Sequence, residues 1–195
     1  RAEIETIPLM RAVYKEVLKV GGNPIIELID DTFDELLFKH GNDEQISFLS
    51  PAQQIHMETC AGLIGLRGKS NTRTLTNVDP QKQQLRQTAR RSLRQTLYQR
   101  AAQGDLRWVA TQFPVPAMAQ EADMSLDEYE DFVYGACHVD KDDPVAEWHK
   151  LRAMQQTLVD WLEGKKDVRV KGPNADLTLS IDGRTFINSD GRRNM

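Results

Sequence analysis

The chain has 195 residues, 39% of them hydrophobic and 28% charged, a composition typical of a globular protein with one full domain and part of another. Its formal net charge of −4 argues against a nucleic-acid binder or a membrane-surface protein. The most apolar run, residues 61–66, is too short to span a bilayer, and no signal-peptide pattern opens the chain. The two cysteines, Cys60 and Cys137, are typical of a reducing compartment, so we expect a cytoplasmic protein.

Helices and short apolar strands alternate through the first 164 residues. Apolar spacing and end signals predict helices at 3–20, 34–39, 43–49, 80–102, 126–136 and 144–163. Two further short helices are predicted, one that begins after Pro51 and one that is introduced by Pro114 and Pro116 and ends at Ala122. Apolar runs predict strands at 25–29, 60–66 and 106–110. A strand expected before the first helix is missing. This order predicts an α/β domain over residues 1–164, with a Rossmann-like parallel sheet flanked by helices.

The pattern changes to period two near residue 165, where we expect a second domain, 165–195, to begin. Residues 175–181 alternate apolar and polar side chains, which is typical of a half-buried strand. Asp182-Gly183 predicts a tight turn, and residues 185–187 are interpreted as the returning strand of a hairpin. Because two strands are marginally stable alone, this hairpin is interpreted as the start of a truncated domain.

Two features of the sequence could indicate a phosphate or nucleic-acid site. Gly68-Lys69-Ser70 resembles the end of a phosphate-binding loop, but the motif needs glycine at the position of Leu63. The predicted helix at 80–102 carries six basic residues and no acid: Lys82, Arg86, Arg90, Arg91, Arg94 and Arg100. A solvated helix face balanced by acids elsewhere explains this basic stripe better than a nucleic-acid contact, since a nucleic-acid domain is usually basic overall.

Metal and nucleophile signatures are weak. The four histidines, His40, His56, His138 and His149, form no HExxH motif. Cys137-His138 with Asp140 and Asp142 could be imagined around one ion, but a helix end followed by an acidic turn explains the spacing better. We therefore nominate no catalytic residue and no metal ligand in this chain.

A series of segments in order along the chain carries a family resemblance. They are Pro8-Leu9, residues 77–82, Trp108 with 111–114, Ala119-Gln120, Met124-Ser125, Glu128-Tyr129, 143–145 with Trp148, and in the tail Asp176, Leu177, Gly183, Arg184, Gly191, Asn194 and Met195. Together they make the chain similar to the amino-terminal domain of the aminopeptidase T / aminopeptidase S family, which are dinuclear metallo-aminopeptidases. The departure is Ala175, where the family usually has threonine.

The resemblance implies a fragment of a longer enzyme that cleaves amino-terminal, leucyl-type residues from peptides. Two divalent ions, zinc or cobalt, would lie in a missing carboxy-terminal catalytic domain, whose first ligand follows Asn194-Met195 closely in the family. No metal is expected on this fragment, which would scaffold and cover the cleft, with Arg184 and Asn194 as possible cleft-bordering residues. A homodimer is also implied, and whether the fragment has any activity alone stays open.

A stand-alone, non-catalytic Rossmann-like binding module is the alternative interpretation. The unclosed hairpin at the end of the chain argues against it, since a hairpin without partners is a poor natural terminus.

Overall fold

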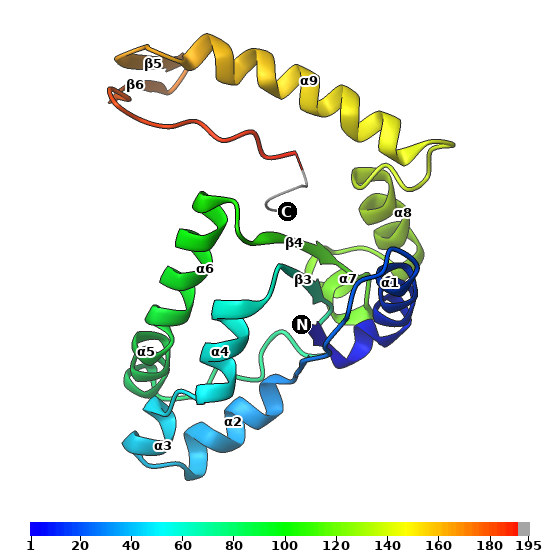
Figure 1. Cartoon of the computed structure of the whole chain (residues 1–195), viewed down its shortest axis with the longest axis vertical. Helices are drawn as coiled ribbons and strands as arrows, with labels where there is room; N and C mark the ends of the chain where they lie inside the picture. The colour runs from blue at the N-terminus through cyan, green and yellow to red at the C-terminus, as the bar shows by residue number, and fades with distance from the viewer. Residues whose placement is uncertain (191–195) are drawn as a thin grey trace.

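The computed structural model describes residues 1–190, and its centre is a four-stranded parallel sheet in the order β2-β1-β3-β4 (Figure 1). The strands are β1 (Ala2–Glu3), β2 (Leu28–Ile29), β3 (Gly62–Arg67) and β4 (Arg107–Gln112). All three pairings are parallel, so the carboxyl ends of the strands meet at one edge. The predicted α/β class with a parallel sheet is confirmed.

The first strand is present, contrary to the expectation that the chain starts one element late. Ala2 is buried, and β1 lies between β2 and β3. The main-chain amide of Leu66 donates to the carbonyl of Arg1 over 2.9 Å. A strand of two residues is too short to show the alternation of apolar and polar side chains by which a strand is recognised in a sequence. The predicted strand at 25–29 is shorter than expected, because Ile25 and Ile26 lie exposed in the loop before β2.

Helices cover the sheet and extend beyond it (Figure 1). They are η1 (Ile4–Thr6), α1 (Ile7–Lys19), α2 (Asp31–His40), α3 (Asp43–Ser47), α4 (Pro51–Thr59), α5 (Pro80–Ala89), α6 (Arg91–Gln103), α7 (Pro116–Glu121), α8 (Leu126–Ala136) and α9 (Pro144–Leu162). The predicted helix at 80–102 is two helices, because the backbone turns at Arg90. No helix within residues 1–190 is long and apolar enough to cross a membrane.

The last part of the described chain forms an arm, made of α9, a hairpin and the return segment 181–190. The hairpin pairs β5 (Asp167–Gly172) with β6 (Ala175–Ser180) in antiparallel register. The predicted pairing of 175–181 with 185–187 is therefore wrong. β6 pairs with the strand before it because Val168 and Val170 lie opposite Leu179 and Leu177, which places four apolar side chains on one face.

The body and the arm differ in burial. The buried apolar residues are Ala2, Phe38, Ile46, Leu66, Leu106, Val115, Ala119, Tyr129 and Val133, all in the body. Within the described arm, α9, β5 and β6 contain no fully buried residue. Figure 1 shows the arm standing away from the sheet. The division into two domains at residue 165 stays a prediction.

Candidate functional site

The carboxyl edge of the sheet contains a topological switch point between β1 and β3. From β1 the chain passes to β2 on one side, and from β3 it passes to β4 on the other. Ligands of open parallel α/β sheets bind in the crevice at such a point. The residues that end the two strands there are Glu3 and, just beyond Arg67, Gly68. This is therefore the first place to look for a bound substrate or cofactor.

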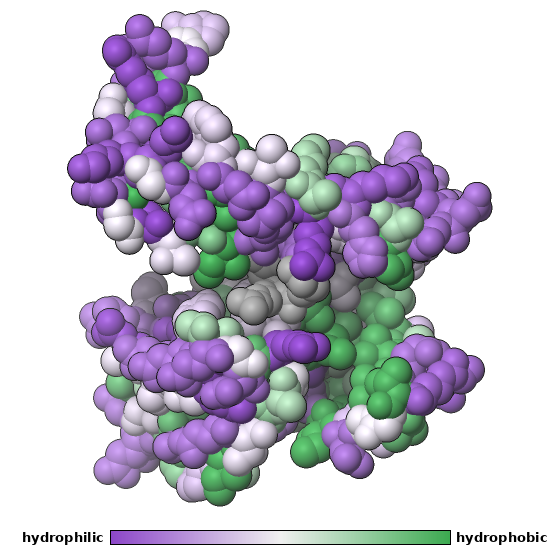
Figure 2. All heavy atoms as spheres, turned by 45° about the horizontal axis from the view of Figure 1, so that its top comes forward, coloured by the Kyte–Doolittle hydropathy of each residue, from purple (hydrophilic) through white to green (hydrophobic). Residues whose placement is uncertain are grey.

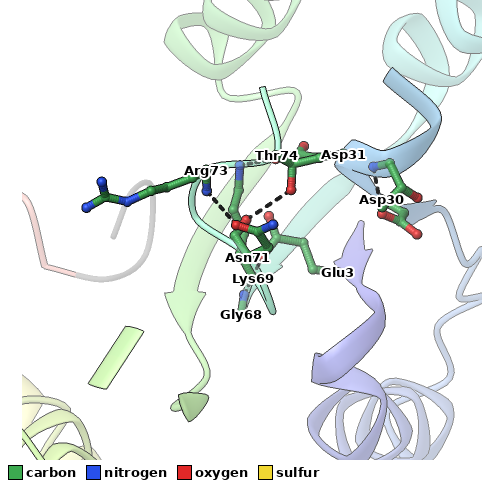
Figure 3. A network of polar contacts seen from close by, with 9 residues as sticks. Glu3, Asp30, Asp31, Gly68, Lys69, Asn71, Arg73 and Thr74 are labelled. Atoms are coloured by element: carbon green, nitrogen blue, oxygen red, sulfur yellow. Dashed lines mark hydrogen bonds and ion pairs between the residues drawn. The ribbon is translucent and has the colours of Figure 1, made fainter. Parts of the chain in front are cut away.

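The switch point is filled by the chain's own side chains (Figure 3). The carboxylate of Glu3 accepts a hydrogen bond from the main-chain amide of Gly68 over 2.5 Å. The ammonium of Lys69 pairs with the carboxylate of Asp31, in the first turn of α2. A loop amide and a lysine are the groups that would hold a phosphate, and here both are bound to carboxylates. In this structure both groups of the Gly-Lys pair therefore make contacts within the chain.

Gly68 is also required by space. A β-carbon at this position would lie 2.9 Å from Cγ2 of Thr6, 3.2 Å from the carbonyl oxygen of Phe113 and 3.3 Å from Cγ1 of Val115. These contacts are shorter than ordinary van der Waals distances. After Gly68 the chain runs through turns, and α5 begins only at Pro80, so the Gly-Lys pair does not open a helix directly. Glycine here lets η1 and the segment that follows β4 pack against the loop after β3.

Residues 71–73, which follow Gly68-Lys69 in the same loop, make hydrogen bonds with one another and with α7. The side chain of Asn71 accepts from the amide of Arg73 over 2.8 Å. The hydroxyl of Thr72 and the guanidinium of Arg73 donate to the carboxylate of Glu121 over 2.7 and 3.3 Å. The hydrogen bond from Thr72, and then that from Arg73, lower the pKa of Glu121. The loop over the switch point is therefore held by Glu3 and Asp31 at its start and by Glu121 of α7 further along.

The basic stripe of α5 and α6 binds main-chain carbonyls rather than facing solvent alone. Lys82, Arg86 and Arg100 reach the carboxyl ends of α2, α3 and α4, and the accepting carbonyl oxygens belong to Phe38, Ile46, Phe48, Met57 and Cys60. Cations there satisfy carbonyls that lack helical partners and favour the helix dipole. For these three residues the interpretation as a solvated face is wrong. Burial lowers the pKa of Arg90, at the break between the two helices.

The cysteine, histidine and acids at the end of α8 form a helix terminus. His138 adopts a left-handed backbone with φ of 59°, and its ring packs edge-on against Trp148 with centroids 5.8 Å apart. The indole of Trp148 donates to the carbonyl of Cys137 over 3.0 Å. Asp140 bonds to Lys141, which lowers the pKa of Asp140. Among residues 1–190, no cluster of three or more His, Cys, Asp or Glu side chains could hold a metal ion.

Of the two residues named as possible cleft-bordering positions, Arg184 lies within the part of the chain that the structure describes. Arg184 is exposed in the turn after β6, where its amide donates to the carbonyl of Ile181 over 3.0 Å and Gly183 has a φ of 68°. This confirms the tight turn predicted at Asp182-Gly183. Asn194 lies outside the described residues, so its role stays a prediction.

Two crevices of about 470 and 230 Å³ lie at the amino ends of the strands, away from the switch point. Both are lined by Arg1, Glu27 and His56, and the guanidinium of Arg1 pairs with Glu27 over 3.0 Å. The other walls of the larger crevice come mainly from α1, the loop 22–26 and β3, and those of the smaller one mainly from α4 and α6. Because α/β sheets bind ligands at the carboxyl edge, neither crevice is favoured as an active site.

Comparisons with known proteins agree with this fold. Aminopeptidase 2 of Geobacillus stearothermophilus is 25% identical over 202 aligned residues, which cover 95% of this chain and 48% of the relative. The solved structure of wild-type AmpT from Thermus thermophilus superposes with a TM-score of 0.70 at 17% identity, covering 92% of this chain and 47% of that one. At that identity the structural likeness shows the fold alone.

The chain spans about half the length of these relatives. The sequence profile of the thermophilic metalloprotease (M29) family matches residues 1–195, the whole of the chain. The chain therefore belongs to the thermophilic metalloprotease family M29.

Proposed function

We propose that this chain is the amino-terminal, scaffolding half of a dinuclear metal-dependent aminopeptidase that removes leucyl-type amino-terminal residues from peptides. Membership of a metalloprotease family supports metal-dependent peptide hydrolysis. The relative named aminopeptidase 2 supports cleavage at the amino terminus. The relatives are about twice as long as the aligned part of this chain, which leaves room for a second half that carries the chemistry.

The closed switch point is the observation that carries the scaffolding role. With Glu3 bound to Gly68 and Lys69 bound to Asp31, the usual ligand position of the sheet is occupied from within. A two-metal hydrolase needs several carboxylates, usually with a histidine, converging on both ions. Residues 1–190 present no such cluster and so do not fit a pair of zinc or cobalt ions. The ions would be held by the other half of the protein.

The hairpin of the arm supports a contact with that other half. Val170, Leu177 and Leu179 lie on one face and are each about half exposed (50%, 51% and 46%), while Arg169 and Asp176 lie on the opposite, polar face. A two-stranded hairpin is marginally stable alone, and an exposed apolar face marks an interaction surface. In this proposal the catalytic half packs on that face, the arm covers the cleft, and the whole protein forms a homodimer.

A stand-alone binding module is the competing interpretation. It would require an accessible switch point, whereas Glu3 and Asp31 occupy the groups that would bind an anionic cofactor. Titration with a dinucleotide or a nucleoside triphosphate should therefore give no saturable heat. Stoichiometric binding of either would favour this alternative.

The decisive experiment is to sequence the gene beyond codon 195 and to assay its intact product. Hydrolysis of leucine p-nitroanilide is expected in zinc or cobalt, abolished by a chelator and restored by metal. The 195-residue chain alone serves as the control, with no hydrolysis and no bound metal expected. Hydrolysis by the chain alone, or an intact product inactive with every divalent metal, would contradict the proposal.

A further inference from the structure

The return segment, residues 181–190, runs back along α9 after the hairpin (Figure 1). Its first residue is fixed by the amide of Ile181, which donates to the carbonyl of Lys166 over 2.7 Å. Near its other end, Nδ2 of Asn188 donates to the carbonyl oxygen of Arg152 over 3.0 Å and to Oε1 of Gln156 over 3.1 Å. The segment is thus bound to the helix at a point 36 residues away in sequence.

Arg152 makes a second contact with the same segment. Its Nε lies 3.3 Å from Oδ2 of Asp190, and the side chain of Asp190 is 1% exposed, whereas that of Arg152 is 44% exposed. A carboxylate withdrawn from water needs a cation or hydrogen-bond donors nearby. The arm also carries a contrasting pair, Arg169 and Asp176, whose side chains are 57% and 54% exposed. An exposed pair of that kind contributes little to stability.

Arg152 therefore binds two points of the segment at once. Its main-chain carbonyl binds Asn188, and its side chain binds Asp190, two residues further on. One contact would fix only the position of the segment. Two contacts from a single helical residue also fix its direction, because the line between residues 188 and 190 is then set relative to α9.

We propose that Arg152 is a positioning residue, which holds the return segment on α9 and so sets where and in what direction the polypeptide leaves residue 190. That the catalytic half of a metallopeptidase continues from this point rests on the proposed function. The contact itself does not depend on it. Arg152 touches no reacting group in this proposal and acts only through the segment that it holds.

Amide hydrogen exchange in the intact protein tests the contact directly. Arg152→Ala should speed exchange of residues 183–190 by roughly tenfold, since a charge-assisted contact to a buried carboxylate is lost. Exchange within β5 and β6 should be unchanged. Arg152→Lys keeps the charge and should restore most of the protection, and Arg169→Ala, the matched control, should leave residues 183–190 unaffected. Unchanged exchange in Arg152→Ala, or equal loosening in Arg169→Ala, would overturn the proposal.

Aminopeptidase kinetics on the same variants test the positioning role. At saturating metal, kcat of Arg152→Ala should fall by about tenfold or more, since small displacements of a catalytic constellation cost this order of rate. KM should change little, and Arg169→Ala should stay within about twofold of the wild type. Faster exchange with an unaltered kcat would overturn the positioning role. If the wild-type protein hydrolyses no peptide, the proposed function fails, while the exchange result still decides the contact.

Discussion

The carboxylate of Glu3, at the end of β1, accepts a hydrogen bond from the main-chain amide of Gly68, just after β3, across the switch point of the sheet. The two residues are 65 positions apart, so the contact joins the first strand to the loop that would otherwise be free to cradle a ligand. In other parallel sheets the switch point binds ligands, whereas here its groups bind one another and join β1 to the loop after β3. The face of the molecule drawn in Figure 2 is mostly hydrophilic, with apolar patches among the polar side chains.

Removal of the Glu3 carboxylate should destabilise the body. Glu3→Ala leaves the amide of Gly68 without its acceptor, and the free energy of unfolding should fall by about 1–3 kcal/mol. Glu3→Gln keeps an acceptor oxygen and should lose less. Urea denaturation followed by circular dichroism measures both, with Glu5→Ala, an exposed residue of η1, as the control. Equal stability of Glu3→Ala and Glu5→Ala would contradict the role assigned to the contact.

A methyl group at two glycines should have opposite effects. Gly68→Ala forces a β-carbon against Thr6, Phe113 and Val115, and should lower the free energy of unfolding by about 1–3 kcal/mol. Gly135 lies inside α8, where a β-carbon would meet no other described atom within 4 Å. Gly135→Ala should therefore raise stability by about 0.5–1 kcal/mol, through the better helix propensity of alanine.

Thermal or urea unfolding of the two alanine variants, measured in parallel, checks this pair. The opposite signs make the test independent of any general effect of adding a methyl group. Destabilisation of similar size in both variants would show that crowding at Gly68 is not the cause.

Loss of the Arg100 side chain should loosen the end of α4. Nη1 of Arg100 donates to the carbonyls of Met57 and Cys60 over 2.9 and 2.8 Å. Arg100→Ala should cost about 2–4 kcal/mol, because two carbonyls lose a charged donor. Arg100→Lys should recover only part, since lysine lacks the planar fork of donors. Arg91→Ala, an exposed position of α6, is the matched control, and hydrogen exchange in residues 51–60 locates the effect.

Local features of the fold could be predicted from the sequence. The side chains of Asp79 and Asp143 accept hydrogen bonds from amides two and three residues further on, and Ser125 with Glu128 forms a capping box. A helix cap depends on residues within one turn, so its signal is contained in a short window. The alternation of helices and strands, and hence the parallel sheet, follows from the same kind of local periodicity.

Long-range features could not be predicted. The hydrogen bond that Glu3 accepts from Gly68 joins segments 65 residues apart, and the one that Arg100 donates to Met57 joins segments 43 residues apart. No local sequence pattern indicates which distant carbonyl or amide a charged side chain will reach. The break between α5 and α6 at Arg90 carries no glycine or proline signal. The predicted partner of β6 is wrong, because strand pairing depends on cross-strand contacts as well as on the alternation within one strand.

The contact of the return segment with α9 was also missed. The helical pattern over residues 144–163 includes Arg152 but does not indicate which distant residues its side chain contacts. After Ile187 the sequence has three short polar side chains, at positions 188–190, and this pattern is equally typical of many loops.

The capping box of α8 should give the protein a measurable dependence on acid. The main-chain amide of Ser125 donates to the carboxylate of Glu128 over 2.9 Å, and this bond, followed by the side-chain bond with Ser125, lowers the pKa of Glu128. A carboxyl group with a lowered pKa in the folded state stabilises the fold above its unfolded pKa, about 4.3 for glutamate, and this stabilisation is lost as the pH falls through the folded pKa.

Glu128→Gln keeps an oxygen that can accept from Ser125 but does not titrate. The wild type should therefore be the more stable of the two at pH 7, and this advantage should disappear at about pH 3. Urea denaturation at about pH 7, 5 and 3 measures the difference between the two proteins, which cancels the titration of all other groups. Asp131→Asn, an exposed change in the middle of α8 and outside the capping box, is the control. A difference between wild type and Glu128→Gln that stays constant from pH 7 to 3 would show that the charge of Glu128 adds nothing to the cap.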